Sequence, residues 1–204
     1  MLVAVLATGS SSLLPKAITP PSVDALDGMR DTHPAPPPAA ASGSAPTLLV
    51  VHPMRAAPGF DRRHIVYVRV AHQLEHFAHS EWVDTPARML APPMAAALEN
   101  TGAFRAVGSA TSGIAGELRL DTEVLRLQQE FGGGPSRVRF TLRASLTDNA
   151  TRRVISSREF EATVVADSDD PYGGVVAANR AVQRVVQQLA SYWSEVSVRW
   201  PTER

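Results

Sequence analysis

The sequence contains no cysteine. Without thiols the chain cannot form a disulfide framework, a zinc–thiolate site or a cysteine nucleophile. It also lacks a surplus of charge of either sign, because twenty lysines and arginines balance twenty aspartates and glutamates. A protein that binds nucleic acid by neutralising phosphates needs excess basic side chains, so we expect no nucleic-acid partner.

Long apolar runs are missing as well. No stretch approaches the roughly 20 residues that a membrane-spanning helix requires. The chain has 204 residues and is 44% hydrophobic. This length and composition are enough for one domain with a real core and a tail, but not comfortably for two domains.

The first residues form a short apolar segment, MLVAVLA, followed by the small residues Thr8 and Gly9. The segment is shorter than the apolar region of a full signal peptide, and no positive charge precedes it. Two interpretations fit: a lipoprotein signal truncated at its N-terminus, or a buried N-terminal strand. In the first, residues 1–10 are a residual signal, and Ser10 occupies the lipidation position where a lipoprotein has cysteine.

Residues 11–46 are rich in proline, alanine and serine, as in HPAPPPAAASGSAP at 33–46. Proline donates no backbone hydrogen bond, and the segment has little apolar surface to bury. We therefore expect an extended, polyproline-like or disordered tether between a signal and a folded domain. A merely disordered N-terminal extension is the alternative.

A folded domain is expected over residues 47–196. Its apolar patterning predicts strands at 47–51, 64–70, 73–79, 104–107, 117–129, 137–146 and 153–165. The last three form an antiparallel meander, and a change of phase at Leu125 and Leu127 predicts a bulge or a strong twist. Residues 54–63 read as a loop, and 197–204 as a C-terminal tail.

Two helices complete the pattern. Thr85 offers a capping hydroxyl before Pro86, and Gly102 is a natural end of the first helix. Pro92 and Pro93 predict either a kink or a main helix that begins at Pro92. The second helix starts at Asp170, where the side chain can cap it, and its apolar stripe should cover the sheet. The fold class is therefore mixed α/β (α+β-like), with a largely antiparallel sheet of about five to six strands covered by helices.

Four polar residues in HQLEHFAHSE (72–81) are candidate metal ligands: His72, Glu75, His76 and His79. Metal ligands must converge on one point. On a strand, alternate side chains point to opposite faces, and the alternation of Leu74 and Phe77 favours a strand. We therefore expect surface histidines and no metal site.

Two further stretches resemble catalytic motifs only in part. GGGP (132–135) lacks the Lys-Ser/Thr of a phosphate-binding loop, and GSATSG (108–113) misses the spacing of a nucleophile elbow. Both read as turns or loops. Arginines at 119, 126, 137, 139 and 143 share the meander with Glu117, Asp121, Glu123, Glu159 and Glu161, which favours cross-strand ion pairs over an anionic ligand. We expect no catalytic residue, no cofactor and no enzyme activity.

Over residues 47–196, the spacing of apolar residues and the positions of proline and glycine resemble those of a known protein family. The residues concerned are Phe77, Trp82, Pro86, Leu90, Leu98, Gly102, Phe104 and Val107. This pattern resembles the ABC-type transport auxiliary lipoprotein family, which includes the outer-membrane lipoprotein of the paraquat-inducible (Pqi) system. His76 and His79 depart from it, since aromatic residues are common there.

The resemblance implies a mixed sheet covered by helices, similar to the N-terminal domain of TolB. It implies a non-enzymatic, homo-oligomeric lipoprotein in the periplasm, anchored to the inner leaflet of the outer membrane. The partners would be an MCE-domain protein and the inner-membrane permease and ATPase of a lipid transport system. Another periplasmic lipoprotein, activating or assembling a cell-envelope enzyme, is the alternative. Because serine is not lipidated, we expect this chain to be an engineered or truncated form that stays soluble as written.

Overall fold

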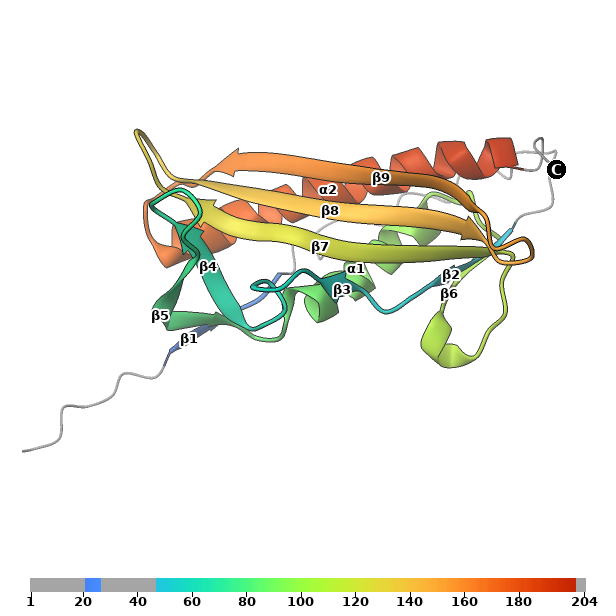
Figure 1. Ribbon diagram of the computed structural model, residues 1–204, viewed down its shortest axis with the longest axis horizontal. Helices are drawn as coiled ribbons and strands as arrows, with labels where there is room; N and C mark the ends of the chain where they lie inside the picture. The colour runs from blue at the N-terminus through green and yellow to red at the C-terminus, as the bar shows by residue number, and fades with distance from the viewer. Residues whose placement is uncertain (1–20, 27–46, 201–204) are drawn as a thin grey trace, which may run out of the picture.

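The computed structural model describes residues 21–26 and 47–200. The expected signal at 1–10 with Ser10, most of the expected tether, and residues 201–204 lie outside the described residues. The described elements, in chain order, are β1 (Ser22–Asp24), β2 (Leu48–Val51), β3 (Arg55–Ala56), β4 (His64–Val68), β5 (Glu75–Trp82), α1 (Pro86–Asn100), β6 (Ala106–Ser109), a 3-10 turn (Ala110–Ser112), β7 (Leu118–Glu130), β8 (Arg137–Asp148), β9 (Val154–Val165) and α2 (Pro171–Arg199) (Figure 1).

All nine of these strands belong to one mixed sheet with β7 at its centre. Along one side β7 pairs with β8, and β8 pairs with β9, forming the predicted antiparallel meander. Along the other side β7 pairs in parallel with β2, β3 and β4 in turn. β6 extends the sheet from β2, and β5 and β1 extend it from β4. The mixed sheet with helices is confirmed, and short parallel strands bring it to nine strands.

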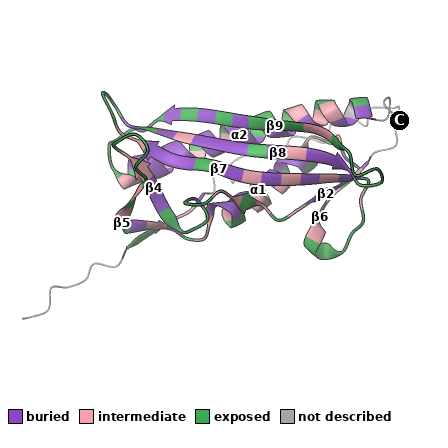
Figure 2. Cartoon of the chain, in the orientation of Figure 1, coloured by how far each residue is buried: buried purple, intermediate pink, exposed green. Residues whose placement is uncertain are grey.

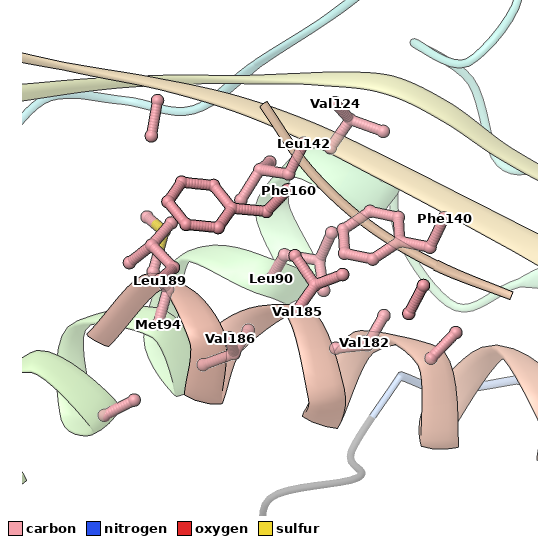
Figure 3. Close-up of a cluster of buried hydrophobic side chains, with 14 of the residues drawn as sticks. Leu90, Met94, Val124, Phe140, Leu142, Phe160, Val182, Val185, Val186 and Leu189 are labelled. Carbon is pink, nitrogen blue, oxygen red and sulfur yellow. The ribbon is translucent and has the colours of Figure 1, made fainter. Parts of the chain in front are cut away.

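Both helices lie on the same face of the sheet, behind β7, β8 and β9 in Figure 1. The core forms between the layers, where Phe140 and Leu142 of β8 meet Val185 and Leu189 of α2 (Figure 3). These four side chains are at most 1% exposed. Burying such a side chain contributes roughly 1.5–3 kcal/mol. The apolar stripe of α2 therefore covers the sheet as predicted.

α1 begins at Pro86 as predicted, but the hydroxyl of Thr85 makes no capping hydrogen bond. The neighbouring carboxylate of Asp84 accepts the Thr85 N–H at 2.7 Å and pairs with Arg88 in the first turn. That carboxylate favours the helix start electrostatically. A helix beginning at Pro92 was wrong, because α1 runs through it without a break. Pro92 lies on the exposed side, where water can bond the carbonyl that proline leaves free.

The start of α2 was predicted correctly. Its cap is the carboxylate of Asp170, which accepts the Gly173 N–H at 2.7 Å. Its end differs from the expected boundary at residue 196, because the helix continues to Arg199 and Trp200 is buried against the core. The residues from 197 to 200 are therefore helical and not a tail.

Two short strands were not predicted. β1 lies within the stretch expected as tether, pairs in parallel with β5, and is followed by the buried Leu26. β3 lies within the expected loop at 54–63 and pairs with β7. Both are only two or three residues long, so their strand geometry comes from the partner strand and not from local apolar patterning.

Candidate functional site

The face of β7–β9 turned away from the helices carries a ladder of charged side chains. Arg139 lies between two carboxylates, with Nε 2.9 Å from Oε1 of Glu130 and Nη1 3.0 Å from Oε1 of Glu161. Arg143 reaches Glu159 across to β9, with Nη2 2.7 Å from Oε1. Figure 2 shows buried and exposed positions alternating along these strands. The cross-strand pairing expected from the sequence is confirmed for these residues.

Glu130 is the most enclosed carboxylate of this ladder, with its side chain 19% exposed. Burial pushes its pKa upward, but hydrogen bonds from Arg139 and Gln128 and the charge of Arg137 outweigh burial and lower the pKa. The same contacts raise the pKa of Arg139. Glu130 therefore stays ionised in neutral solution and is held as a fixed charge.

A β-bulge changes the surface beside this ladder. The register between β7 and β8 shifts between Val124 and Arg126, so Leu125 is the extra residue. Val124 and Leu127 point into the core, whereas Leu125 and Arg126 both line a hollow on the uncovered face. Bulges re-aim side chains in this way. The bulge predicted at Leu125 is confirmed, and its consequence is an apolar and a cationic side chain side by side.

Arg126 differs from the ladder arginines. Among the described residues it has no ion-pair partner, while Arg139 and Arg143 each contact two carboxylates. Its side chain is exposed at the edge of the hollow. The expected pairing therefore does not extend to Arg126, which leaves its cation available to an acidic partner.

The hollow is open and has a volume of about 560 Å³. Its floor is the sheet, and its wall is made by the loops before β4 and between β4 and β5. Apolar and polar groups share its lining: Phe60, Val68, Ala71, His72, Leu74, Leu125, Arg126, Gln128, Glu130 and Arg139.

Two backbone features build this wall. Gly59 has φ +91°, which a residue with a side chain rarely adopts, and Cδ1 of Leu74 lies 3.2 Å from where a Cβ would stand. His72 also has a left-handed backbone, with φ 70°. Left-handed residues outside glycine are uncommon and occur at functional sites as well as in turns. The two loops thus pack together through Gly59 and Leu74, which leaves Leu74 half-exposed over the hollow.

The histidine stretch does not assemble into a site. His72 lies in a turn and not on a strand, while Glu75, His76 and His79 lie on β5. The Glu75 carboxylate bonds Arg69 and accepts from the Tyr67 hydroxyl. Among the residues that the structure describes, no three histidine or acidic groups could hold a metal ion.

His76 has a partner that the sequence did not indicate. Its ring stacks on that of His64 across the β4–β5 pair, with centroids 4.4 Å apart. The alternation of the two strands gave no sign of the contact, because their register was not predictable.

The two motif-like loops are turns. Gly133 has φ +68°, and no atoms lie within 4 Å of a Cβ built at Gly132, Gly133 or Gly134. In the other loop Ser109 accepts the Thr111 N–H and begins the short 3-10 turn. The turns or loops predicted at both stretches are therefore confirmed.

A buried polar network joins the β7–β8 hairpin to the start of α2, and sequence reasoning missed it. Gln129 Nε2 donates to Ser136 Oγ at 2.9 Å and to the Asp170 carbonyl at 3.2 Å. The Ser136 N–H donates to Asp169 at 2.7 Å, which lowers the pKa of that carboxyl. The pair Gly173–Gly174 in the first turn of a predicted helix was the available signal of a close approach.

The loop that precedes α2 is acidic and exposed. Asp167, Asp169 and Asp170 follow the end of β9, and Tyr172 opens the helix with 70% of its surface exposed. This loop lies at the same end of the molecule as the β4–β5 hairpin (Figure 1). Among the large hydrophobic side chains of the described residues, Tyr172 is the most exposed.

Within the described part of the chain, no helix is both long enough and apolar enough to span a membrane. A protein-family model described as "ABC-type transport auxiliary lipoprotein component" matches residues 32–190. No curated protein matches the chain.

Solved structures share the fold. A protein from Xanthomonas campestris is similar with a TM-score of 0.71 and 21% identity, covering 93% of this chain and 100% of its own. An uncharacterized protein is similar with a TM-score of 0.63 and 14% identity, covering 85% of this chain and 99% of its own. A hypothetical protein from Chlamydia trachomatis has a TM-score of 0.51 and 10% identity, covering 75% of this chain and 98% of its own. At these identities the likeness establishes a common architecture.

Proposed function

The chain belongs to the family of ABC-type transport auxiliary lipoprotein components, and from this premise we propose that it serves an MCE-type lipid transport system. In this proposal it is a non-enzymatic, homo-oligomeric periplasmic component that docks the transport conduit at the outer membrane. Its partners are an MCE-domain protein and the permease and ATPase of the same system.

The uncovered sheet face is the observation that carries the proposal. Its most enclosed carboxylate, Glu130 at the end of β7, is held ionised by arginines. An acid or base in catalysis needs a pKa near the working pH, which these contacts oppose. The adjoining hollow combines apolar wall residues with charges, as protein–protein contact surfaces do. These features favour a surface that binds other proteins.

Anchoring is the second part of the proposal, and it rests on Ser10. If the native chain carries a lipidated cysteine there, the twelve residue-to-residue steps from position 10 to Ser22 reach at most roughly 40 Å. The β1 end of the domain would then lie within that distance of the leaflet. Ser10→Cys behind a complete signal should move the protein to the membrane fraction. Protein that remains soluble after this change contradicts the lipidation position.

The transport role is tested by affinity capture from the cell envelope. The Ser10→Cys chain with a complete signal is cross-linked in cells, purified and analysed for co-purifying proteins. The proposal expects the MCE-domain protein and permease, with untagged cells as the control. Recovery of a peptidoglycan synthase without any MCE-domain protein would instead support the alternative, an activator or assembly factor for a cell-envelope enzyme.

A further inference from the structure

Two exposed surfaces of this chain carry side chains of opposite charge. One is the hollow at the β-bulge, where the cation of Arg126 has no partner among the described residues and Leu74 and Leu125 offer apolar surface. The other is the loop from 165 to 172, which we call the acidic loop. Its carboxylates are Asp167, which pairs with Arg180, and Asp169 and Asp170, which accept the backbone N–H groups of Ser136 and Gly173 and have no cationic partner among the described residues. The loop also carries the half-exposed Val165 and ends in Tyr172, 70% exposed.

The hollow is large enough for an aromatic anchor. Ligand pockets typically measure roughly 300–1,000 Å³, and this one measures about 560 Å³. A tyrosine ring can lie against Leu74 and Leu125 while its hydroxyl stays near the polar floor at Gln128 and Glu130. Tyrosine and arginine are the residues enriched where a few contacts dominate an interface.

We propose that the acidic loop of one copy docks in the hollow of the next, with Tyr172 as the anchor and Arg126 facing Asp169 and Asp170, the two loop carboxylates without a cationic partner among the described residues. The second copy is favoured because the same chain carries both the unpaired cation and the exposed aromatic among acids. An enclosed acyl-chain site would be more apolar, whereas this hollow is open and lined equally by polar groups.

The contact has a defined symmetry. The hollow lies on the helix-free face of the sheet. The acidic loop joins the end of β9 to the start of α2 (Figure 1), so the two surfaces do not coincide. A contact between two different patches is head-to-tail, and it closes into a ring when the rotation allows. This inference rests on the homo-oligomer of the proposed function and names the surfaces that form it.

The absence of cysteine from the chain makes a clean crosslinking test possible. Leu74→Cys and Tyr172→Cys are made separately and treated with a short bis-maleimide, alone and mixed. The head-to-tail contact predicts little crosslinking of either variant alone, and covalent dimers in the mixture. A chain with both cysteines should give a ladder of higher multimers. Both side chains are at least half-exposed, so folding should be retained, as thermal melting checks.

Sedimentation equilibrium measures the strength of the same contact. Tyr172→Ala should weaken self-association roughly 30-fold or more, as expected for loss of an interface anchor, whereas Tyr172→Phe should retain most of it. Arg126→Glu should weaken it as well. Arg184→Glu is the matched control, because Arg184 is also an exposed arginine but lies on α2. This change should leave the mass of the oligomer unchanged.

Three results would overturn the inference. One is a mixture without crosslinks although the protein is oligomeric, and another is equal crosslinking of each variant alone, which indicates a two-fold contact. The third is a protein that stays monomeric at every concentration and binds anionic phosphatidylglycerol vesicles through Leu74, which would assign the hollow to lipid. Capture of the MCE-domain protein is independent of these readouts, so either proposal can fail alone.

Discussion

Gly174 of α2 lies directly against the buried side chain of Gln129. A Cβ added at Gly174 would stand 2.2 Å from Oε1 of Gln129, far inside contact distance. The Gln129 amide cannot simply turn away, because its nitrogen donates to Ser136 and to the Asp170 carbonyl. Because Gly174 has no side chain, the start of α2 can approach the sheet this closely.

Gly174→Ala should destabilise the domain by about 1–3 kcal/mol, because the added methyl overpacks this contact. The sign is informative, since alanine in an unconstrained helix would stabilise by up to about 1 kcal/mol. Thermal unfolding should show a fall of roughly 2–4 °C per kcal/mol for a chain of this size. Gly134→Ala is the control, because no atom lies within 4 Å of its added Cβ. A Tm unchanged or raised by Gly174→Ala contradicts the close approach.

Glu130→Gln should lower stability by about 1 kcal/mol at neutral pH, because Arg139 loses its strongest partner. The folded-state pKa of Glu130 is lowered. Its contribution is therefore present above the unfolded pKa near 4.3 and lost as pH falls through the folded value. The difference between wild type and variant in urea unfolding should shrink below about pH 4.

Glu195→Gln is the matched control for that titration. Glu195 is 67% exposed, and its ion pair with Arg199 is long, at 3.8 Å. Loss of this carboxylate should therefore change the stability little at any pH. A Glu130→Gln difference that stays constant from pH 7 to pH 3 would falsify the assignment to the ionised carboxylate.

Trp193→Ala should cost about 3–5 kcal/mol in the free energy of unfolding. The indole is fully buried, with its centroid 4.8 Å from that of Tyr192 and 6.4 Å from that of Phe160. Its Nε1 donor has no partner within the described structure. Trp193→Phe removes that donor and keeps most of the volume, so urea unfolding should show a much smaller loss. Equal losses for the two variants would mean that the packing is not as described.

Zinc should leave the melting temperature unchanged. Glu75 is committed to Arg69 and Tyr67, and His72, in a turn, does not converge with His76. Stabilisation by a ligand grows with its concentration over its dissociation constant, so a real site would raise Tm at high zinc. A rise that disappears in His76→Ala would revive the metal site.

Local patterning predicted the long elements because they bury one face along their whole length. The alternation of β8, from Val138 to Leu146, placed its strand and its inward face correctly. β1 escaped prediction for the opposite reason. Only three residues long, it gains its hydrogen bonds from β5, more than fifty residues away in the chain.

The candidate site was predictable only in part. The bulge at Leu125 shows in the sequence as a change of phase, which marks where the sheet surface is irregular. The wall of the hollow could not be predicted from the sequence, because it forms when Gly59 of one loop contacts Leu74 of another. The missing ion pair of Arg126 was not predictable either, because it depends on which side chains the register and the bulge place beside Arg126.

Phospholipid exchange between the two membranes tests the transport role most directly. Cells are pulse-labelled with a lipid precursor, and label is followed in separated inner and outer membranes. The account predicts that deleting this gene slows exchange as much as deleting the MCE-domain gene, that deleting both slows it no further, and that the Ser10→Cys chain with a complete signal restores it. Exchange at the wild-type rate in the deletion strain, with an altered cell wall, would contradict the account.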